Sequence, residues 1–215
     1  MRHYKAIAFD FDGTLVESIE MKTEAFRELF SEYPEKWEEI REYHLINEGI
    51  SRDVKIPYIY REILNMQLSP KRNQDLVDKY SDMVYAKMLS APLVKGAYEL
   101  LSTGRGVRNQ CIASGTPQSE LRRIFDERDL SKFFDGVYGS PESKVQIVKI
   151  CSEKMNIPAD EMLFVGDAQS DYDAAISLGM DFVWRKRDFE PKKIIADKVF
   201  VTVGDMFELI DLLRE

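Results

Sequence analysis

Short apolar runs alternate with amphipathic stretches along most of this chain. The first run, residues 4–10, ends at an acidic pair and a glycine, a pattern that predicts a buried strand stopping at a turn. Later apolar runs predict further strands at about 107–113, 136–138, 162–165, 182–184 and 198–201. Helical periodicity separates these runs, and such alternation predicts a parallel sheet with right-handed crossovers. We therefore expect an α/β fold, a Rossmann-like parallel sheet flanked by helices.

One long segment breaks this alternation. From about residue 17 to residue 89, apolar residues recur at three- and four-residue spacing, and Ser69-Pro70 has the N-cap and first-turn proline typical of a helix start. We predict an all-helical domain at residues 16–90, inserted into an α/β core domain of residues 1–15 and 91–215. The methionines and aromatic residues of the helical segment are expected to form its own core rather than a ligand pocket.

Composition and charge restrict the class of protein. A chain of 215 residues suits one α/β domain with a smaller insertion, and 44% hydrophobic with 32% charged residues is typical of a globular chain. The formal net charge of −8 argues against a protein that coats nucleic acid and against a polybasic membrane binder. A small anionic substrate stays compatible with this charge, because a bound cation inverts the local field.

The cysteines and the termini add little chemistry. The two cysteines, Cys111 and Cys151, lack paired spacing, so neither a disulfide framework nor a zinc site is expected. We find no signal peptide and no apolar run long enough to span a bilayer, and we expect a cytoplasmic protein. The sequence predicts no nucleic-acid and no membrane partner, and no protein partner can be read from it.

Acidic residues follow two of the predicted strands. Asp10 and Asp12 follow the first strand, and Asp167 follows the strand at 162–165, with Asp171 four residues further along. Chemistry in open parallel sheets collects outside the carboxyl ends of the strands. Carboxylates brought together there repel one another unless a cation neutralises them, and Mg²⁺ prefers oxygen ligands. Asp10 and Asp167 are the natural ligands, whereas Asp171 either faces the same side or is a first-turn aspartate favoured by the helix dipole.

Two further features suit an anion. Ser114 ends the strand predicted at 107–113, Gly115 and Thr116 lead into a helix, and the free N–H groups of that helix start would complete a phosphate seat. The same Ser-Gly-Thr-Pro sequence is also a common helix N-cap. Lys144 stands in the first turn of a predicted helix, where a lysine opposes the dipole. It is either an exposed surface lysine or the partner of a nearby phosphate.

Taken in order, these residues resemble the four motifs of the haloacid dehalogenase-like hydrolase superfamily. The motifs are Asp10-Phe11-Asp12-Gly13-Thr14-Leu15, Ser114, Lys144 and Gly166-Asp167-Ala168-Gln169-Ser170-Asp171. The match runs over nearly the whole chain. The helical segment resembles the C1 cap of the branch that is similar to phosphoglycolate phosphatase and β-phosphoglucomutase.

The resemblance implies a role for each motif residue. Asp10 would be the nucleophile that forms an aspartyl-phosphate, and Asp12 would be the general acid and base. Thr14 would orient the loop, while Ser114, Gly115 and Lys144 would hold the phosphoryl group. The Mg²⁺ ligands implied are Asp10, the main-chain carbonyl of Asp12, Asp167 and, directly or through a second shell, Asp171. The carboxylate at Asp12 favours phosphoryl transfer over dehalogenation.

Selectivity within such a family would come partly from the cap. Arg52, in Gly49-Ile50-Ser51-Arg52, either presents its guanidinium to the substrate or is an exposed arginine at a helix start. Arg61 and Lys55 are weaker candidates, expected at the surface. The basic clusters at 185–187 and 192–193 are expected in a solvated loop that could also attract an anionic substrate.

The expected reaction is Mg²⁺-dependent hydrolysis of a small phosphorylated metabolite, whose identity the sequence leaves open. A phosphosugar mutase is the nearest alternative, because the same aspartyl-phosphate can pass to a second hydroxyl. An alternative of another class is a non-catalytic binding or regulatory protein of the same fold.

Overall fold

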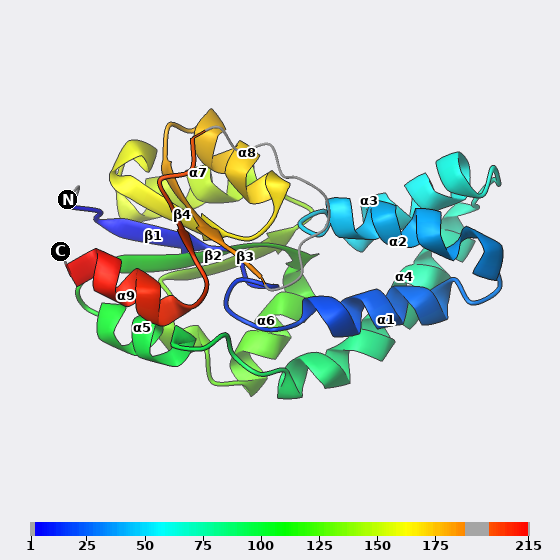
Figure 1. The fold of residues 1–215 in the computed structure, drawn as a ribbon, viewed down its shortest axis with the longest axis horizontal. Coiled ribbons are helices and arrows are strands. Elements are labelled where there is room, and N and C mark those ends of the chain that lie inside the picture. The colour runs from blue at the N-terminus through cyan, green and yellow to red at the C-terminus, as the bar shows by residue number, and fades with distance from the viewer. Residues whose placement is uncertain (1–2, 188–197, 215) are drawn as a thin grey trace.

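A parallel sheet of six strands lies between two layers of helices (Figure 1). The computed structural model describes residues 3–187 and 198–214, and the strand order is β3-β2-β1-β4-β5-β6. The strands are β1 (Ala6–Phe9), β2 (Asn109–Pro117), β3 (Gly136–Ser140), β4 (Met162–Gly166), β5 (Asp181–Arg185) and β6 (Val201–Val203). Each neighbouring pair is parallel, which confirms the predicted fold class.

The central strand shows why the sheet is covered on both faces. Ile7 and Phe9 of β1 join one hydrophobic cluster, whereas Ala6 and Ala8 join another. The first cluster includes residues of α5 (Ala97–Gly104), α6 (Gln118–Glu127) and α9 (Met206–Arg214), and the second includes residues of α7 (Lys144–Met155) and α8 (Gln169–Ser177). A strand buried on both faces reads as a continuous apolar run, as this one does.

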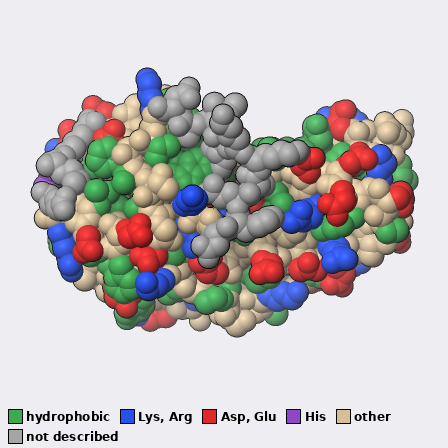
Figure 2. Space-filling model, viewed as in Figure 1, with side chains coloured by type: hydrophobic (Ala, Val, Ile, Leu, Met, Phe, Trp, Pro, Cys, Tyr) green, Lys and Arg blue, Asp and Glu red, His purple; other side chains and the backbone are tan. Residues whose placement is uncertain are grey.

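Residues 16–90, here called the helical insert, contain four α-helices that lie beyond one end of the sheet (Figure 1). These are α1 (Ile19–Leu29), α2 (Trp37–Ile46), α3 (Arg52–Tyr58) and α4 (Pro70–Ser90), with a π-helical turn at Ile59–Ile63. A third hydrophobic cluster belongs to this part of the chain and includes Phe26, Ile56, Tyr80 and Val84. Acidic and basic side chains are interspersed over its face in Figure 2.

The two connections of the helical insert lie side by side. Val16 and Leu93 form an antiparallel bridge. The Glu17 N–H donates to the Pro92 carbonyl at 2.9 Å, and the Val94 N–H donates to the Leu15 carbonyl at 2.9 Å. This paired link coincides with the boundary predicted for the inserted domain, and the domain division itself stays a prediction.

Several local predictions hold. Ser69 accepts a hydrogen bond from the Arg72 N–H at the start of α4, and Ser143 forms a capping box with Gln146 at the start of α7. Gly179, just past α8, has a left-handed φ of 69°.

Short 3-10 turns occupy Pro34–Lys36, Ser131–Phe133 and Ala159–Glu161. Within the described residues, no helix has the length and apolar character needed to cross a membrane.

The largest differences from the predicted strand boundaries are at the end of β2 and the start of β6. β2 continues to Pro117, which pairs with Ser140 of β3 beyond a register irregularity, so α6 begins only at Gln118. β6 begins at Val201, later than expected. Strand ends were misplaced because pairing with a neighbouring strand, rather than local polarity, decides where a strand stops.

Candidate active site

Strand register brings the predicted site residues to one edge of the sheet. Phe9, the last residue of β1, pairs with Ile112 of β2 and with Val165 of β4. The residues that follow each of these therefore emerge together. The Asp10 N–H continues the ladder and donates to the Val165 carbonyl at 2.9 Å.

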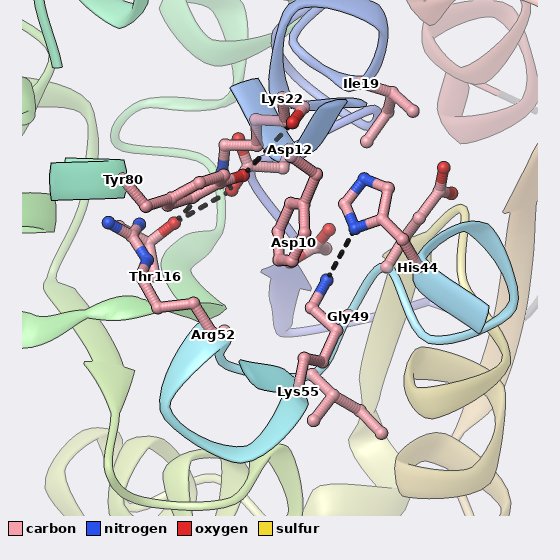
Figure 3. A pocket seen from close by; sticks show the side chains of 14 residues that line it. Asp10, Asp12, Ile19, Lys22, His44, Gly49, Arg52, Lys55, Tyr80 and Thr116 are labelled. Atoms are coloured by element: carbon pink, nitrogen blue, oxygen red, sulfur yellow. Dashed lines mark hydrogen bonds and ion pairs between the residues drawn. The ribbon is translucent and has the colours of Figure 1, made fainter. Parts of the chain in front are cut away.

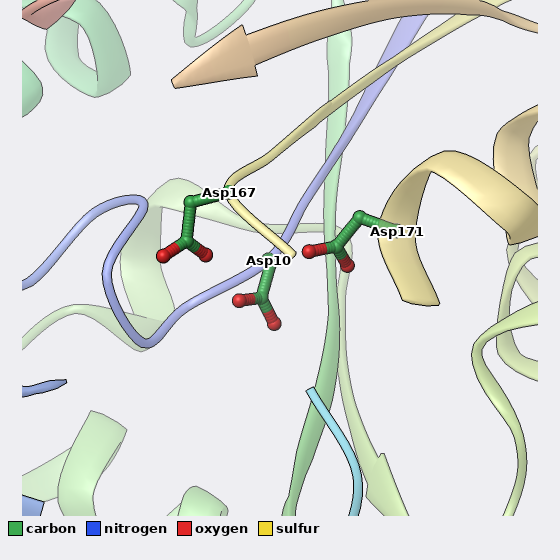
Figure 4. Close-up of side chains that lie close together, drawn as sticks. All are labelled: Asp10, Asp167 and Asp171. Carbon is green, nitrogen blue, oxygen red and sulfur yellow. The ribbon is translucent and has the colours of Figure 1, made fainter. Parts of the chain in front are cut away.

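Three buried carboxylates meet at this edge (Figure 4). Asp10, Asp167 and Asp171 each offer an oxygen atom within 4.8 Å of the others. Lys144 at the start of α7 reaches the same point, where its Nζ lies 3.0 Å from Asp10 Oδ1 and also contacts Asp171 Oδ1. The expectation of an exposed surface lysine is therefore wrong.

Burial dominates the electrostatics of this cluster. It raises the pKa of Asp10 to about 7, of Asp167 to about 8 and of Asp171 to about 6, against the opposing charges of Lys144 and Arg187. Burial works against the charged form of Lys144, but the charges of Asp10 and Asp171 outweigh it and raise the pKa of Lys144. Three carboxylates around one lysine call for a further cation.

The donor atoms fit a hard divalent cation. Asp167 Oδ2 is buried and accepts no hydrogen bond from the part of the chain that the structure describes, although Arg187 Nε lies 3.2 Å away. Asp167 Oδ1 accepts from the Thr14 hydroxyl at 3.1 Å. Both oxygens of Asp171 are already engaged, one by Lys144 and one by the Ala168 N–H at 3.0 Å. Asp10 and Asp167 are therefore the best placed to hold a metal, and Asp171 acts on Lys144.

A glycine is required where the acidic loop passes Asp167. Gly13 has a left-handed φ of 77°, and a Cβ there would overlap the Asp167 carboxylate. Only glycine adopts this conformation without strain and allows such an approach.

Asp12 lies in a different environment from the other acids. Its Oδ1 accepts from the Ser18 hydroxyl at 2.7 Å, and its Oδ2 accepts from the Thr116 hydroxyl at 2.9 Å and pairs with Lys22 Nζ at 2.6 Å. Burial alone would raise the pKa of Asp12, but Lys22 and the two hydroxyls outweigh it and hold that pKa below its ordinary value. Asp12 is an ionised carboxylate at neutral pH.

Sequence reasoning missed Ser18, Lys22 and Thr116. The position of Lys22 in the sequence could have indicated its role. It lies three residues after Ile19 and four before Phe26, on the apolar face of α1, where an unpaired charge would be costly.

The predicted phosphate seat has a different construction. Ser114 is buried inside β2, four residues before α6, so the expectation that a helix N-terminus begins beside it is wrong. Its Oγ accepts from the Thr116 N–H at 3.1 Å. Gly115 permits close packing of the insert, since a Cβ there would stand 2.6 Å from the Gly49 carbonyl oxygen.

Arg52 is buried and fully engaged, so the alternative of an exposed arginine is wrong. Its Nη1 and Nη2 bond the two carboxylate oxygens of Glu120 at 2.8 and 2.9 Å, and Nη1 donates to Ser81 Oγ at 2.6 Å. Glu120 belongs to α6 of the sheet region. Arg52 therefore joins the helical insert to the rest of the molecule, and it also lines the site pocket.

Other basic residues also differ from expectation. Lys55 is buried rather than at the surface, whereas Arg61 is exposed as predicted. Arg185 is buried and donates to the Gly13 carbonyl at 3.0 Å, and Arg187 pairs with Glu48, so neither belongs to a solvated loop. The second cluster, Lys192-Lys193, lies outside the described residues.

A cavity of about 40 Å³ separates the helical insert from the strand ends (Figure 3). The insert closes tightly over it, because a Cβ at Gly49 would overlap Ser170 Oγ and stand 3.1 Å from Lys144 Nζ. The residues around the cavity include Asp10, Asp12, Lys22, Phe26, His44, Glu48, Arg52, Lys55, Tyr80 and Thr116.

Comparison with known proteins agrees with this arrangement. The family model described as haloacid dehalogenase-like hydrolase matches residues 4–179. A phosphorylated carbohydrates phosphatase of Thermotoga maritima is 24% identical over 98% of this chain and 99% of its own length. A phosphoglycolate phosphatase of Vibrio parahaemolyticus is 29% identical over 81% of this chain and 80% of its own. The crystal structure of a predicted phosphatase from Clostridium acetobutylicum superposes with a TM-score of 0.76 at 20% identity, over 99% of this chain and 100% of that one.

Proposed function

The chain belongs to the haloacid dehalogenase-like hydrolases and is a phosphoric monoester hydrolase, and from this premise we propose a Mg²⁺-dependent phosphatase that acts on a small phosphorylated metabolite. One observation carries the proposal. Lys144 Nζ lies 3.0 Å from Asp10 Oδ1, within a group of three buried carboxylates. A buried nucleophile, a cation that can neutralise phosphate charge and free carboxylate oxygens for a metal thus occupy one place.

Asp10 is the proposed nucleophile. A carboxylate oxygen of Asp10 forms a bond to phosphorus, the bond from phosphorus to the leaving oxygen breaks, and that oxygen takes a proton from Asp12. In the second step Asp12 removes a proton from water. The resulting hydroxide attacks phosphorus, so that inorganic phosphate leaves and the Asp10 carboxylate is restored.

Asp12 is in the protonation state that the second step requires. The proton it donates in the first step must be acquired when substrate is bound. A phosphate dianion beside Asp12 raises the pKa of that carboxyl, because like charge disfavours the ionised form. Its hydroxyl partners, Ser18 and Thr116, hold the carboxylate in place whichever form is present.

Asp10, Asp167 and the main-chain carbonyl of Asp12 would hold Mg²⁺. The bound ion supplies charge compensation that lets an anionic nucleophile approach an anionic phosphate. Lys144 supplies part of the same compensation from the protein. Gly115 lines the cavity that would receive the phosphoryl group, Ser114 precedes it in β2, and the Thr14 hydroxyl holds Asp167 by a hydrogen bond.

The helical insert, residues 16–90, is proposed to act as a cap domain over the core of residues 1–15 and 91–215. The paired link at Val16 and Leu93 is the natural hinge. A closed insert leaves a cavity of only about 40 Å³, so substrate must enter while the insert is displaced. Closure would then exclude bulk water from the reacting phosphate.

The decisive experiment measures phosphate release from p-nitrophenyl phosphate, with and without Mg²⁺. We expect activity only with Mg²⁺, and a loss of about three orders of magnitude or more in Asp10→Asn. Asp75→Asn, on the exposed face of α4, is the matched control and should retain wild-type rates. Equal rates for wild type and Asp10→Asn would contradict the assignment of the nucleophile.

A further inference from the structure

Lys55 is a buried cation that has no carboxylate partner among the described residues. Only 4% of its surface is exposed, and its Nζ lies 3.1 Å from His44 Nδ1 and 5.1 Å from the centre of the Phe26 ring. A buried charge without a counter-ion is costly, and proteins normally pair it. The helical insert therefore contains an unsatisfied positive group.

The other cations that line the same cavity, Lys22 and Arg52, are paired with Asp12 and Glu120. The lining carboxylate of Glu48 is paired with Arg187. Among the described residues that line the cavity, Lys55 is therefore the cation without a carboxylate partner. Its neighbour adds a second open position, because His44 Nε2 is buried and finds no hydrogen-bond partner within residues 3–187 and 198–214.

Both side chains border the cavity that the proposed catalytic residues also line. Lys55 and His44 come from α3 and α2 and line the same cavity as Asp10 and Asp12. Figure 3 shows the contact between the two side chains among the residues that line this cavity. A substrate whose phosphate reaches Asp10 would present its remaining atoms to this pair.

We propose that Lys55 and His44 determine substrate specificity by binding a carboxylate, so that the enzyme prefers a phosphomonoester that also carries a carboxylate over one that carries a hydroxyl in its place. The inference rests on the proposed function. A single unmatched positive charge matches a carboxylate, which brings one negative charge, better than a second phosphate, which brings nearly two. The small closed cavity also favours the smaller group.

The surroundings of Lys55 are consistent with a site awaiting an anion. Burial lowers the pKa of Lys55 to about 7; Lys22 and Arg52 add to this effect, and Glu48 and Asp12 oppose it. Burial and the positive charges of Lys55, Lys22 and Arg187 hold the pKa of His44 well below its ordinary value. A bound carboxylate would raise the pKa of Lys55, so binding would draw a proton onto its amine.

The test compares two substrates that differ only in the group of interest, phosphoglycolate and 2-hydroxyethyl phosphate. We expect wild type to prefer phosphoglycolate in kcat/KM. In Lys55→Met the ratio of the two kcat/KM values should fall by about 10- to 100-fold, mainly through the KM for phosphoglycolate. Lys79→Met, an exposed lysine of α4, is the matched control and should leave the ratio unchanged.

A second variant protects the test against misfolding of the first. His44→Phe keeps a ring beside Phe26, whose centroid is 4.3 Å from that of His44, and removes both ring nitrogens. It should lower the same ratio by a smaller factor. A wild-type enzyme without preference, or a ratio that Lys55→Met leaves intact, would overturn the inference. The proposed function fails separately, if wild type shows no Asp10-dependent release from p-nitrophenyl phosphate.

Discussion

The two sides of the site cavity have opposite charge requirements. On the sheet side, Asp10, Asp167 and Asp171 surround one lysine, and the described part of the chain leaves an oxygen of Asp167 without a hydrogen bond. On the side of the helical insert, none of the described carboxylates pairs with Lys55, whose Nζ contacts His44 instead. The sheet side needs a cation and the insert side needs an anion. A phosphorylated acid together with a divalent metal would satisfy both.

The two sides are also positioned by different means. The sheet side follows from strand register, since Phe9 of β1 is aligned with Ile112 of β2 and with Val165 of β4, and the site residues follow these positions. The insert side is assembled from α1, α2 and α3, whose mutual packing brings Lys22, His44 and Lys55 to one cavity. Register is robust to changes in surface residues, whereas helix packing can drift. The proposed catalytic residues are thus positioned by strand register. The proposed selectivity residues are positioned by the packing of α1, α2 and α3, which can change more easily.

The largest effect is expected from removing the cation of the sheet side. Lys144→Met should lower phosphatase activity by about 10³-fold, because charge stabilisation at the phosphoryl group is lost. It should also lower the free energy of unfolding of the metal-free protein by about 3 kcal/mol or more, since buried carboxylates lose their partner. Phosphate release and urea unfolding measure the two effects.

Magnesium separates the two roles of Lys144. Added Mg²⁺ should stabilise Lys144→Met more than it stabilises wild type, because the carboxylates of the variant are less compensated. Lys149→Met, exposed on the same helix α7, is the control for both measurements. If Lys144→Met is as stable as wild type, the buried carboxylates take up protons when Lys144 is absent and need no cation.

The next largest effect tests whether the two sides must meet. A Cβ at Gly49 would overlap Ser170 Oγ and would stand 3.1 Å from Lys144 Nζ, so Gly49→Ala should displace either Ser170 or the insert and crowd the Lys144 amine. We expect kcat/KM to fall by about 100-fold, as is typical when reacting groups are misplaced by an ångström or so, with little change in melting temperature.

A second glycine provides the control for this prediction. A Cβ at Gly204 would stand 3.5 Å from Glu208 Oε1, an ordinary contact, and Gly204→Ala should therefore be silent. Wild-type activity in Gly49→Ala would mean that catalysis does not require the close approach of Gly49 to Ser170. The two sides of the cavity would then not need to meet for the reaction.

The sheet side was largely predictable from sequence. Asp10 and Asp167 stand directly after apolar runs, and parallel strands bring such positions together whatever the loops do. The position of Ser114 was predicted less well, because β2 continues beyond it by pairing with β3. Local polarity predicts a strand core better than its end.

The insert side could not be predicted in the same way. Lys55 and Arg185 were expected in water because charged residues are mostly exposed, and yet both are buried. Their surroundings come from residues distant in sequence, such as His44 for Lys55 and Glu17 for Arg185. No local pattern carries such information. Only Lys22, placed on an apolar helix face, gave a local sign of burial.

The unpaired charge of Lys55 should appear in the pH dependence of stability. Its pKa is about 7 in the folded protein, below the ordinary value of 10.5, so between these values the folded state binds fewer protons than the unfolded state. Stability should therefore rise with pH across this window, by up to roughly 1.4 kcal/mol per pH unit from this group.

Urea unfolding at pH 7, 8.5 and 10 measures that slope. Lys55→Met should lose the contribution, and Lys79→Met should keep it. If Lys55→Met and wild type show the same slope, the amine is charged in the folded protein at pH 7 and has a counter-ion. The insert side would then have no unmatched positive charge, and the contrast with the sheet side would be wrong.

The smallest effect concerns the pair that joins the two sides. Arg52 and Glu120 form a buried bidentate ion pair between α3 and α6, so each should depend on the other. A double-mutant cycle with Arg52→Met and Glu120→Gln, followed through kcat/KM for p-nitrophenyl phosphate, should give a coupling energy of about 1 kcal/mol. The exposed pair Arg123–Glu127, cycled in the same way, should give a coupling energy near zero.

If Arg52 binds substrate instead, Arg52→Met will raise KM while Glu120→Gln does not, and the two changes will add. If the two single variants lower kcat/KM equally and the double variant lowers it no further, Arg52 acts through Glu120. Its role is then to hold the helical insert, where Lys55 lacks an anion, against the sheet, where the carboxylates lack a cation.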